Sequence, residues 1–161
     1  MDSLDPRSES NVATLLPAAQ EKAREFMEKC ATAMFPYTVK IICGTRTYEE
    51  QNELYKQGRE TSGDIRTNAR GGYSYHNFGI AFDVGIFDWQ KKYIDELPES
   101  EISKASVDGI YRAAGEIGES IGLEWGGRWK SIVDLPHLQW NPKKLTIIQL
   151  REKHESGEAY I

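Results

Sequence analysis

The sequence predicts a small α+β protein with one domain spanning residues 1–161, and three observations support this. The chain has 161 residues, of which 39% are hydrophobic and 28% are charged, which suits one globular domain with its own apolar core. Patterns typical of helices and of strands alternate along the chain. The strands are short and irregular and the loops between them are long, which favours α+β over a parallel α/β sheet.

The first third of the chain is expected to contain two helices and one strand. Residues 1–13 are interpreted as an extended arm. Pro17 suits the first turn of a helix, and the segment YTVKIIC, 37–43, has the β-branched and aromatic residues of a strand. Thr47 and Glu50 form a capping-box pattern that opens a second helix ending at Gly58. The apolar stripe of the first helix consists of Ala19, Ala23, Phe26, Cys30 and Ala33.

A long loop and an alternating strand follow. Residues 58–75 show no periodicity, and a loop of this length in a small domain is usually functional. The segment GIAFDVGIF, 79–87, places branched and aromatic side chains on one face. Its other face carries Gly79, Ala81, Asp83 and Gly85. Because three of these residues are so small, we expect open space around Asp83, as a metal ion and a substrate would require.

The last third is expected to contain two helices and a short strand. An apolar repeat through Ile110, Ala114, Ile117 and Ile121 predicts a helix that ends at Gly122. The segment PHLQW, 136–140, is expected to be an edge strand, where a leading proline is tolerated. Thr146 and Gln149 match the cap of a last helix, so residues 146–161 are expected to form a C-terminal helix and tail.

Charge and segment composition argue against several classes of partner. The net charge of −5 disfavours binding to nucleic acid or to an anionic membrane surface. The first ten residues, MDSLDPRSES, do not resemble a signal peptide, and no apolar run is long enough to insert in a membrane. We therefore expect a monomer that is made in the cytoplasm.

Two short segments each place a histidine near an aspartate. His76 and Asp83 bracket SYHNFGIAFD, 74–83, and Asp134 and His137 lie in DLPHLQW, 134–140. Catalytic zinc uses three protein ligands and keeps one position open. The set His76, Asp83 and His137 would satisfy this requirement, and Asp134 would be free to transfer protons.

Other interpretations remain open from the residues alone. A single histidine at a loop edge is more often a hydrogen-bonded structural residue. A serine hydrolase would use Ser74, but the chain has no GxSxG elbow. Cys30 and Cys43 follow no paired zinc-binding spacing and lie in apolar patterns, which favours buried, inert thiols over a nucleophile or a disulfide.

The two segments together resemble a known family. SYHNFGIAFD matches the SxHxxGxAxD motif of the zinc peptidases that include D-alanyl-D-alanine carboxypeptidases and L-alanyl-D-glutamate endopeptidases, and EWGGRWKSIVDLPHLQ, 124–139, matches their second motif. The endolysin-like branch is most similar, and the likeness extends over residues 42–140, the expected catalytic core. The resemblance implies a central antiparallel sheet flanked by helices, as in lysostaphin-like peptidases and the hedgehog domain.

The resemblance also assigns roles to individual residues. It implies that His76, Asp83 and His137 bind one zinc ion and that Asp134 is the catalytic acid and base. Arg46 would act in catalysis by stabilising the oxyanion, or would bind a substrate carboxylate. The positions that match the family's substrate-binding residues are Arg46, Gln51, Ser74 and Trp125.

The function that the resemblance implies is hydrolysis of a bond in the stem peptide of peptidoglycan, after release of the protein from the cytoplasm or cell lysis. An L-alanyl-D-glutamate endopeptidase is favoured, with a D-alanyl-D-alanine carboxypeptidase as the alternative. The hedgehog domain keeps a similar zinc site while acting by binding partners, so a zinc-stabilised binding module without turnover is the alternative from another class.

Overall fold

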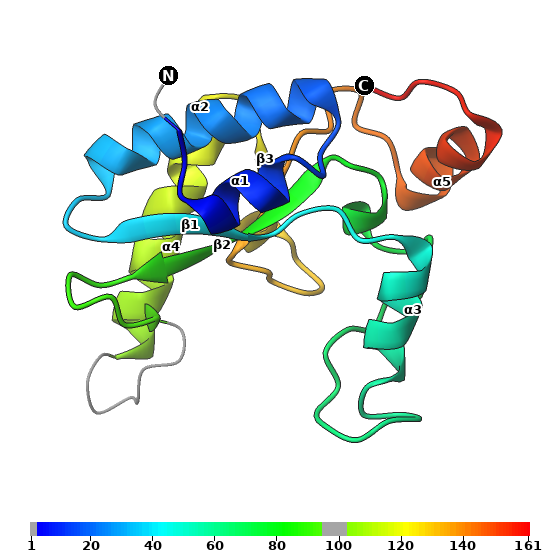
Figure 1. Ribbon diagram of the computed structural model, residues 1–161, viewed down its shortest axis with the longest axis horizontal. Coiled ribbons are helices and arrows are strands. Elements are labelled where there is room, and N and C mark those ends of the chain that lie inside the picture. The colour runs from blue at the N-terminus through cyan, green and yellow to red at the C-terminus, as the bar shows by residue number, and fades with distance from the viewer. Residues whose placement is uncertain (1–2, 95–102) are drawn as a thin grey trace.

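The computed structural model describes residues 3–94 and 103–161. Within them, one antiparallel sheet has the strand order β1-β2-β4-β3. Figure 1 shows helix α2 above the sheet and helices α3 and α5 at one end of the molecule. This confirms the predicted α+β class. The strands are β1 (Thr38–Cys43), β2 (Ala81–Phe87), β3 (Glu124–Trp125) and β4 (His137–Gln139), and the longer helices are α2 (Pro17–Ala33), α3 (Tyr48–Lys56), α4 (Lys104–Ser120) and α5 (Ile147–Ser156).

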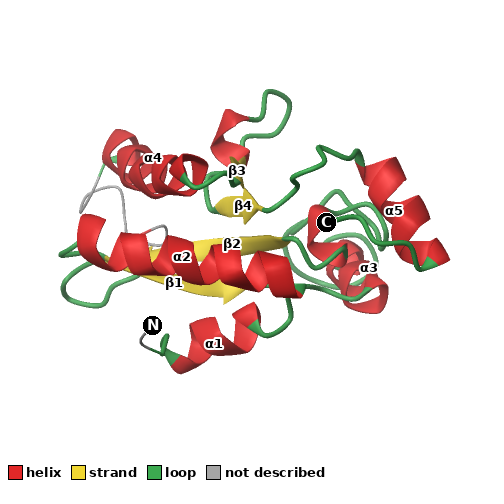
Figure 2. Cartoon of the chain, turned by 90° about the horizontal axis from the view of Figure 1, so that it is seen from above, coloured by secondary structure: helices red, strands yellow, loops and turns green. Residues whose placement is uncertain are grey.

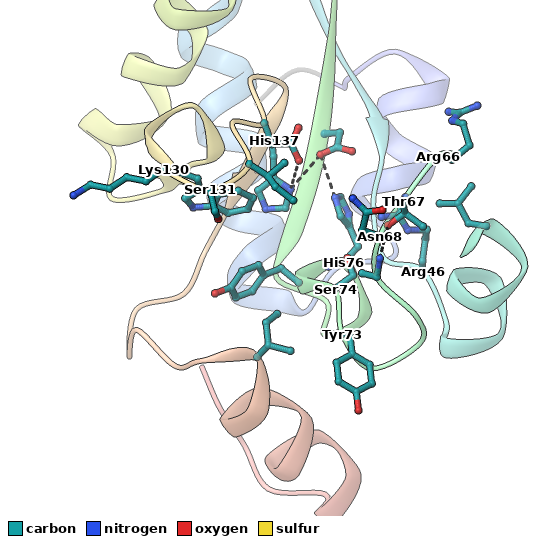
Figure 3. Close-up of a pocket in the computed structure, with 18 residues that line it drawn as sticks. Arg46, Arg66, Thr67, Asn68, Tyr73, Ser74, His76, Lys130, Ser131 and His137 are labelled. Carbon is teal, nitrogen blue, oxygen red and sulfur yellow. Dashed lines mark hydrogen bonds and ion pairs between the residues drawn. The ribbon is translucent and has the colours of Figure 1, made fainter. Parts of the chain in front are cut away.

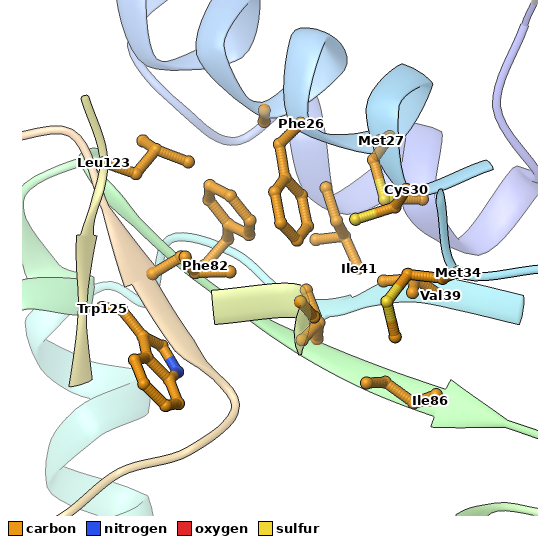
Figure 4. Close-up of a cluster of buried hydrophobic side chains, with 14 of the residues drawn as sticks. Phe26, Met27, Cys30, Met34, Val39, Ile41, Phe82, Ile86, Leu123 and Trp125 are labelled. Atoms are coloured by element: carbon orange, nitrogen blue, oxygen red, sulfur yellow. The ribbon is translucent and has the colours of Figure 1, made fainter. Parts of the chain in front are cut away.

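Helix α2 supplies apolar cover for the sheet. Figure 2 shows it running along β1 and β2, and the core that it forms with the strands is drawn in Figure 4. The rings of Phe26 and Phe82 are 5.7 Å apart between centroids, and both side chains are buried. Truncating either ring to alanine would cost about 3–5 kcal/mol of folding free energy. The predicted stripe is therefore the core face of α2, except for the exposed Ala33 at its end.

The expected extended arm is wrong, because Pro6–Val12 forms a helix, α1. Asp5 caps it by accepting a hydrogen bond from the Ser8 backbone N–H at 3.0 Å. Ser8 Oγ accepts from the Ile41 N–H at 2.9 Å, and Asn11 Nδ2 donates to the Ile41 carbonyl at 2.9 Å. The helix thus satisfies edge groups of β1 that would otherwise be unpaired. A helix this short has too few apolar positions to show a period in the sequence.

The expectation that residues 136–140 form an edge strand is also wrong. Strand β4 lies between β2 and β3, with Phe82 and Trp125 both paired with Leu138. The partner β3 is only two residues long, so no alternating pattern reveals it. The carbonyl of Pro136 accepts a hydrogen bond from the Val84 N–H at 2.9 Å, so the proline precedes β4 without breaking its pairing.

The predicted helix boundaries are largely confirmed. Both capping boxes are present, Thr47 with Glu50 at α3 and Thr146 with Gln149 at α5. Helix α4 begins at Lys104, capped by Ser103, a few residues before its predicted apolar repeat. Among the described residues, no helix has the length and apolar character needed to cross a membrane.

Candidate metal centre and active site

Two strands and a short helix bring three predicted ligands together. His76 lies in the 3-10 helix η1 (Tyr75–Asn77), Asp83 in β2 and His137 in β4. Asp83 Oδ1 is 3.1 Å from His76 Nε2 and 3.3 Å from His137 Nδ1. The register of the sheet pairs Asp83 directly with His137. Figure 3 shows both imidazoles directed at the carboxylate from opposite sides.

Hydrogen bonds on the outer sides of the rings orient both imidazoles. His76 Nδ1 is 2.9 Å from the Gly44 carbonyl, and His137 Nε2 is 2.7 Å from Gln139 Oε1. Each of these oxygens accepts a hydrogen bond, so the hydrogen of each neutral ring belongs on the outer nitrogen. In the neutral form that binds a metal, the inner nitrogens therefore carry the lone pairs that face Asp83. Two such imidazoles and a carboxylate are a donor set that fits zinc.

Electrostatics couple the three side chains. Burial disfavours the charged form of His76, but the Asp83 carboxylate outweighs it and raises the pKa of His76 to about 10. Burial likewise opposes ionisation of Asp83, yet His76 and His137 together hold the pKa of Asp83 well below its ordinary value. The carboxylate therefore stays ionised in this setting, as a metal ligand must.

Asp134 lies beside this group and is more exposed. Its Oδ2 is 3.8 Å from His137 Nδ1, and 38% of its side chain is exposed. Burial and then the charge of Asp83 raise the pKa of Asp134. The Asp134 N–H donates to the Gly126 carbonyl at 3.0 Å, which holds its backbone against the preceding turn. A partly exposed carboxyl group whose pKa is raised suits proton transfer at the site.

Cys43 offers a second set of possible ligand atoms. The groups Cys43–His76–Asp83 and Asp83–Asp134–His137 each place ligand atoms within 4.8 Å of one another. Cys43 Sγ, however, is 3.9 Å from His76 Nδ1, the nitrogen that faces Gly44. Cys43 lies opposite Asp83 across β1 and β2, but its thiol approaches His76 at the outer nitrogen, which already faces the Gly44 carbonyl. The convergence of both inner nitrogens on Asp83 favours the aspartate and the two histidines as one ligand set.

The expectation of open space beside Asp83 at Gly85 is wrong. A Cβ at Gly85 would lie 3.0 Å from Ile42 and 3.2 Å from Tyr93, so neighbouring side chains already fill that space. Gly79 has a φ of +72°, a conformation that glycine adopts far more readily than other residues. The small residues thus allow close packing and a turn. The open side of Asp83 faces a cavity built by loops instead.

That cavity has a volume of about 950 Å³. It contains the three predicted ligands and Asp134, and its walls come from the loop before η1 and from the segment 129–134. The long loop that the sequence marked as functional therefore does line the site, and Ser74 lies there as predicted. Cavity residues that the sequence did not single out include Arg66, Thr67, Asn68, Tyr75, Lys130 and Ile132. No residue-level pattern distinguishes them in the sequence.

Two of the predicted substrate contacts, Gln51 and Trp125, are buried. Gln51 is fully buried; its Oε1 accepts from Arg46 Nε at 2.9 Å and its Nε2 donates to the Ala69 carbonyl at 2.8 Å. Trp125 is 3% exposed and donates to the Leu135 carbonyl at 2.7 Å. Both lie outside the cavity lining. Through these bonds Gln51 supports Arg46 and the loop of Ala69, and Trp125 supports the segment that follows Asp134.

Comparisons with known proteins agree with this geometry. A family described as D-alanyl-D-alanine carboxypeptidase matches residues 67–140. The peptidoglycan L-alanyl-D-glutamate endopeptidase CwlK of Bacillus subtilis is 40% identical over 114 residues, which cover 71% of this chain and 67% of CwlK.

Two solved structures share the fold. DacB from Streptococcus pneumoniae D39 superposes with a TM-score of 0.55 at 21% identity, over 94% of this chain and 81% of DacB. The vancomycin resistance D,D-pentapeptidase VanY, solved with Zn(II), gives a TM-score of 0.53 at 15% identity, over 91% of this chain and 81% of VanY. The likeness to CwlK, together with the family match across both motifs, identifies the chain as a member of the family of zinc metallopeptidases that comprises D-alanyl-D-alanine carboxypeptidases and L-alanyl-D-glutamate endopeptidases.

Proposed function

We propose that this enzyme is an L-alanyl-D-glutamate endopeptidase of peptidoglycan and that His76, Asp83 and His137 hold its single zinc ion. The observation that carries the metal assignment is the convergence of both inner imidazole nitrogens on one oxygen of Asp83, at 3.1 and 3.3 Å. The likeness to CwlK supports the specificity. Zinc, when bound, lowers the pKa of a water molecule and polarises the scissile carbonyl.

Asp134 is proposed to move the protons of the reaction. As a carboxylate it accepts a proton from the attacking water, and as a carboxylic acid it returns that proton to the nitrogen of the departing amine. Its raised pKa favours the second step, because an acid that holds its proton nearer neutral pH can deliver it there. Its exposed fraction of 38% leaves room for it to reach both groups.

Arg46 is proposed to stabilise negative charge on the substrate. Its Nε is occupied by Gln51, and one terminal nitrogen lies 3.6 Å from Cys43 Sγ. The guanidinium lines the cavity, where a fixed cation can stabilise an oxyanion or a carboxylate. Ser74, whose Oγ accepts from the His76 N–H at 3.2 Å, is proposed to contact the substrate while holding η1.

The cavity volume of about 950 Å³ is at the upper end of the range for small-molecule sites, roughly 300–1,000 Å³, and suits several residues of a stem peptide. We propose a monomer that acts on peptidoglycan after release from the cytoplasm and that does not bind nucleic acid or insert in membranes. The net charge of −5 supports the absence of nucleic-acid binding, and among the described residues no helix is long and apolar enough to cross a membrane.

A D-alanyl-D-alanine carboxypeptidase is the second candidate, because the family match over residues 67–140 carries that description. A binding module without turnover is less well supported, since Asp134 is present and partly exposed beside the ligands.

Digestion of purified peptidoglycan, followed by mass analysis of the fragments, tests the specificity. An endopeptidase releases peptides that begin with D-glutamate, whereas a carboxypeptidase releases free D-alanine, and a chelator should stop either reaction. An Asp134→Asn protein should keep its zinc and lose roughly a hundredfold or more in kcat. Full activity in that variant would show that Asp134 does not transfer the proton.

A further inference from the structure

The two walls of the cavity differ in chemistry. Figure 3 shows Arg46 and Arg66 on the side of His76, and Lys130 and Ser131 on the side of His137. The wall beside His76 therefore carries two guanidinium groups, whereas the other wall presents Trp129 and Ile132 together with Lys130. Figure 3 shows the Lys130 side chain extending away from His137, and Arg66 at the outer end of the opposite wall, beyond Arg46. The cationic wall is the one that continues from Arg46.

The backbone around Arg66 is held while its side chain remains free. Arg59 donates to the Thr67 carbonyl at 3.0 Å and to Asn68 Oδ1 at 3.2 Å. Gln51 donates to the Ala69 carbonyl in the same loop. Arg66 itself is exposed and lines the cavity, and no carboxylate of the described residues lies within ion-pair distance of it. A cation that lies unpaired beside a cleft, on a loop whose backbone is held, is available to an anionic ligand.

Charge in the proposed substrate lies on one side of the bond that is cut. Cleavage between alanine and glutamate places the glutamate on the departing side. A glutamate residue has two carboxyl groups, and at most one continues the peptide, so the other remains free unless it is amidated. The alanine side adds no charged side chain. The departing fragment is therefore the part of the substrate that a cationic wall would attract.

We propose that Arg66 is a specificity-determining residue that binds the free carboxylate of the departing glutamate. The departing fragment then lies along the Arg46–Arg66 wall, and the alanine side lies along the Trp129–Ile132 wall. This inference rests on the proposed endopeptidase function. An exposed guanidinium contributes only modestly to the free energy of substrate binding. Its contact with the carboxylate forms already in the enzyme–substrate complex, before the transition state. Its loss should therefore raise KM more than it lowers kcat.

Kinetics on two matched tripeptides test the proposal. The first is N-acetyl-L-alanyl-D-glutamyl-L-lysine with the free glutamate carboxylate, and the second differs only in having that carboxylate amidated. The wild type should prefer the acid by roughly three- to tenfold in kcat/KM. The Arg66→Gln protein should lose this preference, mainly through KM, and Arg66→Lys should keep part of it.

Two controls remove a positive charge elsewhere. Lys130→Gln changes the opposite wall, and Arg70→Gln changes the same loop outside the cavity lining; both should keep the wild-type preference. An Arg66→Gln protein with an unchanged preference, or an equal loss in either control, would overturn the role of Arg66. Failure of the wild type to cut after alanine in peptidoglycan would instead overturn the proposed function, and the inference with it.

Discussion

Gln51 holds Arg46 by accepting a hydrogen bond from Arg46 Nε at 2.9 Å, while its own amide nitrogen donates to the Ala69 carbonyl at 2.8 Å. The buried Gln51 side chain thus connects the Arg46 guanidinium to the loop of Ala69, which forms one wall of the cavity. Because Gln51 holds Nε and Nη1 donates to Cys43 Sγ at 3.6 Å, Nη2 is the terminal nitrogen left to turn toward the cavity. Gln51 therefore acts on the site through Arg46.

Replacing Gln51 by leucine should lower kcat/KM by about ten- to a hundredfold, because a guanidinium displaced by about an ångström no longer meets the developing charge. Steady-state kinetics with zinc content and circular dichroism measured on the same samples would show this. Asn52→Ala is the matched control, since Asn52 accepts from the Gly71 N–H of the same loop at 2.8 Å without touching Arg46. Equal losses in both variants would indicate general loosening of the loop.

Replacing Gln139 by leucine should weaken zinc binding by about ten- to a hundredfold, because His137 Nε2 loses the acceptor that orients its ring. Competition with a chelator of known affinity measures the change. Glu124→Gln serves as the control, since an amide at 124 can still accept from Gln139 Nε2, which now donates to Glu124 at 3.1 Å. An unchanged affinity in Gln139→Leu would mean that packing alone orients His137.

Replacing Asp83 by asparagine should abolish stoichiometric zinc binding while the fold remains, because the side-chain volume is kept and the anionic ligand is lost. The wild type should melt at a lower temperature after chelation, since a metal that binds only the folded state stabilises it. The melting temperature of the Asp83→Asn protein should be insensitive to the chelator. Zinc retained at one equivalent in this variant would remove Asp83 from the ligand set.

The Glu9–Arg24 pair should make the docking of α1 sensitive to acid. Glu9 accepts from both terminal nitrogens of Arg24 at 2.9 and 2.8 Å, and these bonds, with one from the Leu4 N–H, lower the pKa of Glu9 from 4.5 to about 2. A carboxylate whose pKa is lower in the folded state stabilises the fold above its unfolded pKa. This contribution is lost as the pH falls from 4.5 to 2.

Melting temperatures of the wild type and Glu9→Gln across that range would test this prediction. The difference between the two proteins should be largest above pH 4.5 and should shrink toward pH 2. Glu21→Gln, which removes an exposed carboxylate from α2, should follow the wild type. A constant difference at all pH values would show that Glu9 acts through packing and not through its charge.

The sequence alone predicted the α+β class and the main helices, and its resemblance to a zinc peptidase family predicted the side chains that would hold a metal. Apolar periodicity marked α2 and α4, capping boxes marked the starts of α3 and α5, and two motifs contained His76, Asp83, His137 and Asp134. These features are local, since helix periods and caps depend on residues only a few positions apart. For that reason they could be read without the fold.

The tertiary structure decided what depends on contacts between distant segments. Helix α1 is held against the edge of β1 by the hydrogen bond between the Ile41 N–H and Ser8 Oγ. Strand β4 is interior because the two-residue strand β3 pairs with its outer side. The fold also buries Gln51 and Trp125, two of the expected substrate contacts, and pairs them with Arg46 and the Leu135 carbonyl. Arg66 became a candidate for substrate binding only once its loop lay beside Arg46. Hydrogen bonds and charges across such long separations leave no period in a sequence, so only the folded chain reveals them.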